Sequence, residues 1–215
     1  MNKSDLSSQK RIRKFDIIAF GLKLGWMSCL KGDIRKGLKR IILPVNYWRV
    51  SIFKHVAEHI LGNISDTDST LKILDIGSPK LLALYLSSQI NGDVYTTDLQ
   101  DPAIFSEWER YFHNTSDKTN LKVEYANAKN LPYPDSFFQV IYSLSVVHMI
   151  SPAEDGDILA LKEMQKKLCQ GGMLVLEFPY RQQYRVNFKE RNNFEETYAG
   201  VPVLSERQYD ENALR

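Results

Sequence analysis

The sequence predicts an α/β fold: a doubly wound, mostly parallel sheet that follows a group of basic helices. After residue 70, short apolar runs typical of strands alternate with segments at helical spacing, a pattern that builds a parallel sheet with helices on both faces. Charge is also unevenly divided, because residues 1–54 hold 13 Lys and Arg against 3 Asp and Glu, and the remainder holds 15 against 23. With 43% hydrophobic and 25% charged residues, the composition excludes collagen, a coiled coil and wholesale disorder.

The basic part of the chain is predicted to be helical. Residues 15–30 form a first apolar segment, and a second helix follows in which Ile34, Leu38, Ile41 and Ile42 make one apolar stripe beside several Lys and Arg residues. Pro44 ends that helix. Asn46 can cap a third, which runs to about Gly62.

Strands and helices then alternate to residue 178. Strands are predicted at residues 71–76, 94–97, 121–125, 138–143 and 173–178, and helices at residues 80–90, 101–112 and 151–169. Residues 151–154 read as a capping box for the last helix, which is expected to end at Gly171 and Gly172.

Ligands of such sheets bind outside the carboxyl ends of the strands, so the residues just after each strand are the candidates. They are Asp75 and Gly77, then Asp98, then Asn127 and Ala128, and finally Ser143, Ser145 and His148. Asp98 lies 23 residues beyond Asp75, close to the offset of about 20 residues at which an acidic residue binds ribose hydroxyls in nucleotide-binding units. The alternative is that Asp98 only caps a helix or ends a strand.

Several of these segments resemble the motifs of class I S-adenosylmethionine-dependent methyltransferases, which have a Rossmann-like fold. LKILDIG at residues 71–77 is similar to their first motif, and VYTTD at residues 94–98 is similar to the second. NAKNLPYPDSFFQVI at residues 127–141 resembles the stretch DAxxLPFPDxSFDxV of the subgroup called type 11. LCQGGMLV at residues 168–175 is similar to the start of strand five, and the resemblance covers residues 47–180.

The resemblance implies S-adenosyl-L-methionine as cofactor. Gly77 and its neighbours would approach the methionine part, with Asp75 near its amino group, and Asp98 would hold the ribose. Asn127, where the family usually has Asp, and the amide of Ala128 would contact adenine, with Ser143 under the sulfonium. The cofactor-binding residues expected from the resemblance are therefore Asp75, Gly77, Ser78, Asp98, Leu99, Asn127, Ala128 and Ser143.

The chain departs from the family at three places. Pro79 and Leu81 stand where the family has its second and third glycines, and Gln139 replaces an Asp at the start of strand four, at what we expect to be a structural position. The family sheet has seven strands in the order 3-2-1-4-5-7-6, but only 35 residues follow Tyr180. We therefore expect a shortened chain whose sheet lacks the last two strands and leaves strand five as an apolar edge.

The resemblance implies methyl transfer, most simply to a small-molecule acceptor. His148 is the candidate general base, because imidazole titrates near neutral pH, although it could equally pack against or cap the next helix. Pro79, Leu81 and the short C-terminus favour an alternative, a non-catalytic binding protein. A nicotinamide-dependent oxidoreductase is a third hypothesis, disfavoured by the missing GxGxxG motif. No metal site is predicted, because His55 and His59 have no evident third ligand.

The predicted organisation is a basic helical segment (1–62), a cofactor-binding core (63–180) and a C-terminal tail (181–215). The basic segment is expected to be an amphipathic lid over the cofactor site, and contact with nucleic acid or an anionic membrane surface is the alternative. No apolar run approaches the roughly 20 residues of a transmembrane segment. Two distant cysteines, Cys29 and Cys169, favour a reducing, cytoplasmic location.

Overall fold

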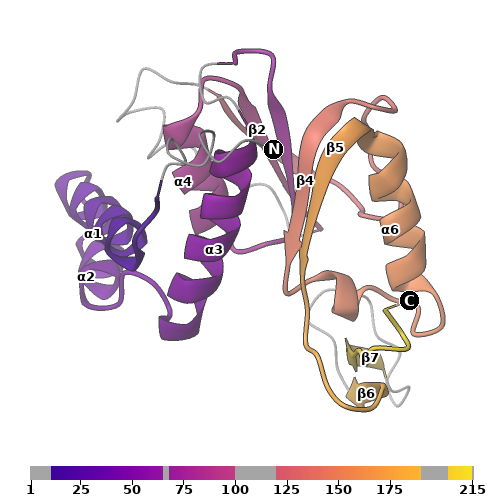
Figure 1. Cartoon of the computed structure of the whole chain (residues 1–215). Helices are drawn as coiled ribbons and strands as arrows, with labels where there is room; N and C mark the ends of the chain where they lie inside the picture. Colours follow the sequence, from indigo (N-terminus) through magenta and orange to yellow (C-terminus); the bar gives the residue numbers. More distant parts are fainter. Residues whose placement is uncertain (1–10, 65–67, 100–119, 190–202, 215) are drawn as a thin grey trace. The chain divides into compact units, whose positions relative to one another are not determined.

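A computed structural model describes residues 11–64, 68–99, 120–189 and 203–214 of the chain (Figure 1). The chain divides into two compact units. The helical unit comprises Met1–Thr70, Lys80–Asp93 and Glu107–Leu121, and the sheet unit comprises Leu71–Pro79, Val94–Ser106 and Lys122–Arg215.

The described part of the helical unit contains helices α1 (Lys14–Leu30), α2 (Ile34–Ile42), α3 (Tyr47–Asn63) and α4 (Leu81–Gln89). These helices were predicted to within two residues at each end. Side chains at the helix starts explain part of this agreement. Asp16 accepts a hydrogen bond from the Arg13 amide at 2.7 Å, and Asp33 accepts one from the Lys36 amide at 3.3 Å, so each satisfies a backbone donor that the helix leaves open.

The sheet is five-stranded, with β1 (Lys72–Ile76), β2 (Asp93–Asp98), β3 (Leu121–Tyr125), β4 (Phe138–Leu144) and β5 (Leu168–Glu177) in the order β3-β2-β1-β4-β5. β1 and β4 are parallel, with Asp75 opposite Tyr142, and β4 and β5 are parallel, with Ser143 opposite Leu176. This confirms the predicted α/β fold class. Because β1, β4 and β5 run parallel, their carboxyl ends meet at one edge of the sheet.

Helix α6 (Gly156–Lys167) packs along the sheet in this unit, and Figure 1 shows it beside β4 and β5. Ala160 and Met164 of α6 are fully buried in a cluster with apolar residues of the strands, including Leu74, Phe138 and Ile141. Gln139 accepts a hydrogen bond from the Lys72 amide at 2.7 Å, so this departure from the family motif joins β4 to the start of β1.

Two predicted boundaries were wrong. Residues 151–154 do not cap α6: the helix begins at Gly156 after Asp155. Arg207 binds the carbonyl groups of Pro152 and Ala153 and so holds the preceding residues as a turn, and the Pro152 carbonyl also accepts from the Gly156 amide at 2.9 Å. At the other end, the helix stops at Lys167 rather than at the glycines, and Gly171 and Gly172 lie within β5. The helix predicted at residues 101–112 lies outside the described residues.

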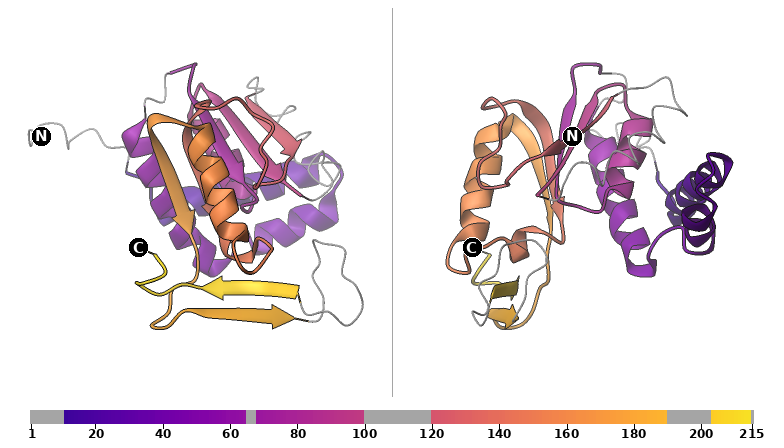
Figure 2. Two further views of the ribbon diagram at one scale, coloured as in Figure 1. Left: turned by 90° about the vertical axis from the view of Figure 1, so that its right-hand side faces the viewer. Right: turned by 180° about the vertical axis from the view of Figure 1, so that it is seen from behind.

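The C-terminal tail contains a hairpin that the sequence did not predict in full. β6 (Arg185–Lys189) and β7 (Val203–Gln208) pair antiparallel as a separate two-stranded sheet, shown in the left view of Figure 2. β5 is accordingly an edge strand of the five-stranded sheet, as expected. The five-stranded sheet was expected to lack the last two strands of the family, and β6 and β7 pair with each other without extending it.

Candidate functional site

A glycine turn follows β1. Gly77 has φ +65°, a left-handed conformation that residues with a side chain rarely adopt, and its amide donates to the Thr97 carbonyl at 2.8 Å. A Cβ at this position would lie only 2.9 Å from Cγ1 of Val146, in the loop after β4. Both the backbone conformation and the close approach therefore require glycine here.

Two backbone hydrogen bonds join the ends of three strands. The first is the Gly77–Thr97 bond, which places the glycine turn beside the end of β2, and the second runs from the Ala126 amide to the Asp98 carbonyl at 3.1 Å. The structure thus brings together the segments after β1, β2 and β3 that the sequence singled out separately.

The side chains of Asp75, Ser78 and Ser143 are buried and bind other parts of the chain. Asp75 is 0% exposed, and its two carboxylate oxygens accept from the Ser78 amide at 3.2 Å and from the Thr96 hydroxyl at 2.6 Å. Ser78 Oγ accepts from the Leu144 amide at 2.8 Å, and Ser143 Oγ donates to the Ile76 carbonyl at 2.9 Å. These side chains hold the β1 turn against the end of β4.

The remaining expected cofactor residues differ in their exposure to solvent. Asp98 is half-buried at the end of β2, Leu99 and Asn127 are exposed, and Ala128 is buried. The Asn127 side chain accepts from the Lys129 amide at 2.9 Å, which fixes the turn after β3. A carbonyl oxygen has two lone pairs, so this contact leaves acceptor capacity on the asparagine.

The loop after β4 is held by the end of β5. Ser145 has φ +60°, an uncommon value for a non-glycine residue. Its amide donates to the Glu177 carbonyl at 3.0 Å, and its hydroxyl donates to the Glu177 carboxylate at 2.5 Å. Backbone strain of this kind persists only where the surroundings over-determine it, and it is concentrated at functional sites.

His148 lies in the short helix η2 (Val147–Met149) that follows this loop, and it is 5% exposed. Its Nδ1 atom has no hydrogen-bond partner among the residues that the structure describes. Burial lowers the pKa of His148 below its usual value, and the nearby Arg207 acts in the same direction, whereas the carboxylates of Glu206 and Glu177 oppose the shift. The imidazole is therefore neutral at neutral pH, the form that a base requires.

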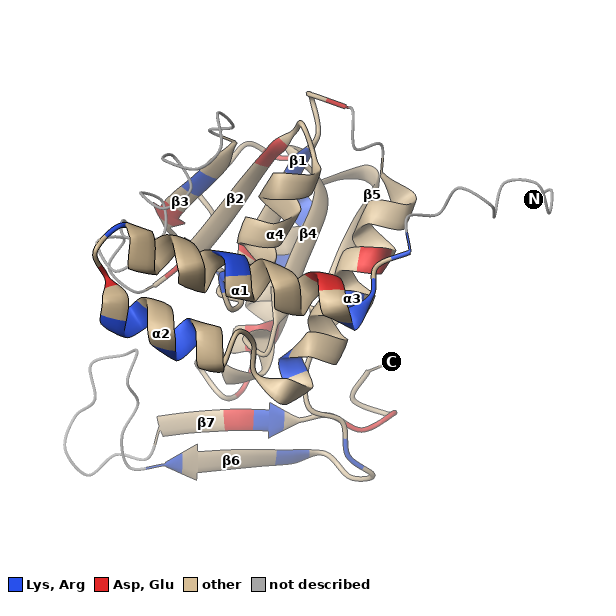
Figure 3. Ribbon diagram, turned by 90° about the vertical axis from the view of Figure 1, so that its left-hand side faces the viewer, with Lys and Arg blue, Asp and Glu red and all other residues tan. Residues whose placement is uncertain are grey.

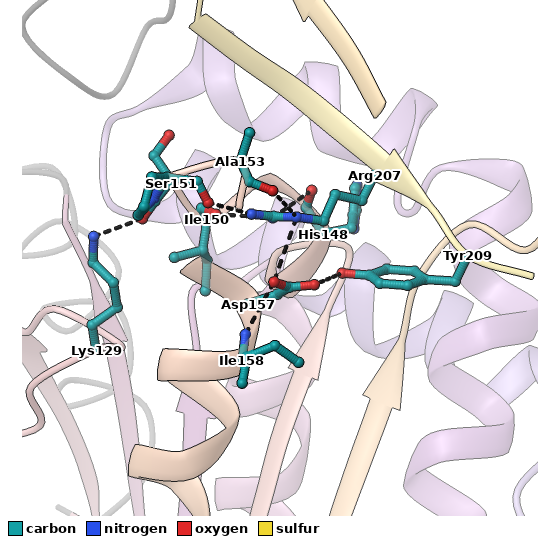
Figure 4. A network of polar contacts seen from close by, with 10 residues as sticks. Lys129, His148, Ile150, Ser151, Ala153, Asp157, Ile158, Arg207 and Tyr209 are labelled. Atoms are coloured by element: carbon teal, nitrogen blue, oxygen red, sulfur yellow. Dashed lines mark hydrogen bonds and ion pairs between the residues drawn. The ribbon is translucent and has the colours of Figure 1, made fainter. Parts of the chain in front are cut away.

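Arg207 on β7 binds the segment after His148 through several carbonyl groups (Figure 4). Its guanidinium, in a side chain that is 1% exposed, donates to Ile150 at 2.9 Å and Ala153 at 3.2 Å, and also to Pro152 and, weakly, His148. Arg207 also lies 3.5 Å from the Asp157 carboxylate, which accepts from the Tyr209 hydroxyl at 2.6 Å.

This network was missed from the sequence. An arginine in a charged tail is typical of a solvated position, and the carbonyl groups that it binds lie 54 to 59 residues earlier in the chain. No local sequence pattern predicts such contacts. Lys129, next to Ala128, also binds the segment after His148, because its ammonium donates a hydrogen bond to the Ser151 carbonyl at 2.6 Å.

Residues 74–176 match the family model described as a methyltransferase domain, the type 11 model. Just under half of the chain thus matches a methyltransferase domain. The matched segment of the methyltransferase domain begins in β1 and ends in β5, so it includes the glycine turn, Asp98, Asn127 and the loop after β4. A search of curated proteins finds no match.

Solved structures share the fold of this methyltransferase domain. A protein from Galdieria sulphuraria assigned as a sarcosine dimethylglycine methyltransferase is 19% identical, with a TM-score of 0.50 over 58% of this chain and 44% of the other. A geranyl diphosphate methyltransferase in complex with S-adenosylmethionine is 15% identical, with a TM-score of 0.51 over 64% of this chain and 52% of the other. The chain thus spans about half the length of these structures.

Proposed function

We propose that this chain transfers the methyl group of S-adenosyl-L-methionine to a small-molecule acceptor. The main support for the proposal is a pair of backbone hydrogen bonds, Gly77 to Thr97 and Ala126 to Asp98. These bonds bring the ends of three strands together. A nucleoside with an amino-acid tail needs a close-approach turn, a ribose acceptor and an adenine contact side by side. The names of the two neighbouring structures refer to small-molecule acceptors, which supports the proposed acceptor class.

The residues at this edge fit the cofactor. Gly77 is partly exposed and carries no side chain, so the methionine part would approach its backbone directly. Asp98 would accept from the ribose hydroxyls, and Asn127 from the adenine amino group. When bound, S-adenosyl-L-methionine supplies a methyl group that its sulfonium already activates.

The chain's own contribution to the reaction is positioning. Alignment of two reactants accounts for much of the rate of a transfer that needs little proton movement. Asp75, Ser78 and Ser143 hold the β1 turn, and Ser145 is bound to Glu177, so both loops that border the site are fixed before any ligand arrives. The neutral imidazole of His148 is a candidate acceptor for a proton from the nucleophile.

Calorimetric titration of the full chain with S-adenosylhomocysteine tests the cofactor assignment. Asp98→Ala should weaken binding about ten- to a hundredfold, since ligand hydroxyls would lose their acceptor. The matched control is Asp135→Ala, which removes an exposed carboxylate just before β4, at the opposite edge of the sheet, and should leave the affinity unchanged. Equal affinities for the two variants, or tighter binding of NAD, would overturn the assignment.

A transfer assay tests the acceptor class and the non-catalytic alternative together. The chain is incubated with methyl-labelled S-adenosylmethionine and a cell extract separated into low-molecular-weight, protein and nucleic-acid fractions. Label in the low-molecular-weight fraction, lost with Asp98→Ala, is the expected result. Label only in a macromolecular fraction contradicts the acceptor class. Tight S-adenosylhomocysteine binding without transfer to any fraction supports the non-catalytic alternative.

A further inference from the structure

Helices α1 and α2 form a hairpin that packs through its smallest residues. A Cβ on Gly25 of α1 would lie 2.9 Å from Cγ1 of Ile41 and 3.0 Å from the Gly37 carbonyl oxygen. A Cβ on Gly37 of α2 would in turn meet Cys29 and would lie 2.7 Å from the Gly25 carbonyl oxygen. The two backbones therefore approach each other at their glycines, with Ile41 beside Gly25, and the other large apolar residues of α2 are exposed.

Large apolar residues of both helices are exposed in two rows. In each helix, three of them recur at every fourth position, which places them along one face. The rows are Leu22, Trp26 and Leu30 on α1 and Ile34, Leu38 and Ile42 on α2, all of them exposed. Trp26 is 61% exposed and Ile42 is 75% exposed, values far above those of core residues.

Both rows lie on the same side of the hairpin. The helices are joined by residues 31–33 and run in opposite directions (Figure 3). Each residue turns the helix by about 100° about its axis. Measured from the glycine that faces the other helix, the first residue of each row lies at about 60° and the last at about 140°, and the direction of rotation is the same in both helices. For antiparallel neighbours, the same sense of rotation leads to the same side. The two rows therefore form one apolar surface, which we call the hairpin face.

Cations border the hairpin face. Arg35 and Lys39 lie next to the α2 row on the surface of the helix, on the side away from α1, and both are exposed. Figure 3 shows the concentration of Lys and Arg along α2. Residues 11–54 as a whole hold 11 Lys and Arg against 2 Asp and Glu. An exposed apolar row with Lys and Arg on its flank is the pattern of helices that lie in the interface of a membrane.

We propose that the hairpin face binds the surface of an anionic membrane. Acidic headgroups would pair with Arg35, Lys39 and their neighbours, while the apolar rows enter the boundary between headgroups and acyl chains. Trp26 has the amphipathic ring that favours this depth. A second copy of the chain is a poorer occupant, because it would bring two strongly basic faces together. The phosphates of a nucleic acid would pair with the cations, but the apolar rows would remain in contact with water. No helix in the described residues is long and apolar enough to cross a membrane, and an interfacial hairpin does not require one.

Flotation of the full chain with vesicles tests the proposal. We expect binding to phosphatidylcholine vesicles that contain phosphatidylglycerol, little binding to pure phosphatidylcholine, and release as salt shortens the Debye length from about 10 Å at 0.1 M to about 3 Å at 1 M. Tryptophan fluorescence should shift to the blue on binding, and Trp26→Phe should reduce that shift. This readout does not depend on the proposed methyl transfer.

Two paired variants separate the apolar and the charged contributions. Leu38→Ser with Ile42→Ser should weaken binding about tenfold or more through lost apolar burial. Arg35→Gln with Lys39→Gln should weaken it about 30-fold, from about fivefold per cation near an anionic surface. The controls are Ile158→Ser with Leu159→Ser and Lys162→Gln with Lys166→Gln, which change exposed residues of the same types on α6 and should bind like the unchanged chain.

Several results would overturn the proposal. They include no vesicle binding, equal binding to both vesicle types, equal loss in the α2 and α6 variants, and loss of a dimer with Leu38→Ser and Ile42→Ser in place of loss of vesicle binding. Binding of duplex DNA that needs Arg35 and Lys39 but not Leu38 and Ile42, without vesicle binding, would also overturn it. Unchanged circular dichroism spectra and unfolding midpoints confirm that each variant is folded.

Discussion

The guanidinium of Arg207 lies 3.5 Å from the carboxylate of Asp157, and both side chains are buried. Arg207 is on β7 and Asp157 is in the first turn of α6, so this ion pair fastens the C-terminal hairpin to the helix that supports the sheet. The same guanidinium binds the carbonyl groups of the loop that carries His148.

Arg207→Met should lower the free energy of unfolding by about 3–5 kcal/mol, because the change strands a buried carboxylate and removes the donors from several carbonyl groups. Arg207→Lys should recover less than half of the loss, since one ammonium cannot span the same acceptors. Urea unfolding followed by circular dichroism measures both. Arg185→Met, which removes an exposed arginine from the adjoining β6, should change stability by less than about 0.5 kcal/mol. Similar midpoints for Arg207→Met and Arg185→Met would contradict the assigned role.

Tyr209→Phe should cost about 1–3 kcal/mol, because the buried Asp157 carboxylate loses a 2.6 Å hydrogen bond. Burial and this bond together raise the pKa of Tyr209 well above its usual value. A double-mutant cycle with Asp157→Asn should give a coupling of at least about 0.5 kcal/mol by urea unfolding. Tyr184→Phe is the control, because that ring contacts Tyr209 but is 45% exposed. Additive effects of Tyr209→Phe and Asp157→Asn would show that the bond contributes nothing.

His148 should make stability fall in mild acid. Its pKa is lowered in the folded chain, so the unfolded chain takes up a proton before the folded chain does as pH drops below about 6.5. The contribution is therefore complete above that pH and declines below it by up to about 1.4 kcal/mol per pH unit. Urea unfolding between pH 5 and pH 8 should show a weaker pH dependence for His148→Gln than for the unchanged chain. Replacing the exposed His55 by Gln should leave the dependence as it is.

Gly77→Ala should destabilise the chain by about 2–4 kcal/mol and weaken S-adenosylhomocysteine binding. A left-handed alanine costs about 1–2 kcal/mol, and the contact with Val146 adds to it. Gly171→Ala provides a comparison, because Gly171 has φ +75° but a Cβ there would meet no atom within 4 Å, so it should show the conformational cost alone. Val146→Ala combined with Gly77→Ala should recover the steric part. No difference between the two glycine variants would show that Val146 imposes no constraint.

Much of the fold follows from local patterns. The strand of residues 121–125 was predicted to the residue and β1, β2 and β4 to within one residue at each end, because runs of β-branched and aromatic residues bounded by turns identify strands without knowledge of their partners. The site segments were found in the same way, since in a parallel sheet the residues after successive strands must meet at one edge.

Other features depend on contacts between distant residues. The start of α6 was misplaced because Arg207, more than 50 residues later, binds the carbonyl groups of Pro152 and Ala153 and so holds the residues before the helix as a turn. The apolar stripe of α2 was evident in the sequence, but its exposure was not. Only the close approach of Gly25 and Gly37 decided that Gly37 faces α1 and that Ile34, Leu38 and Ile42 face outward.

The sequence by itself therefore determined the order of strands and helices, the methyltransferase motifs and the residues that gather at the carboxyl edge, because each depends on spacing along the chain. Tertiary structure alone decided which of those side chains are used up in holding the β1 turn, how the loop after β4 is fixed, and which face of α2 meets solvent. These outcomes depend on which polar groups and which backbone segments come together in space. A hydrogen bond requires its donor and acceptor to be close in space, whatever their separation in the sequence.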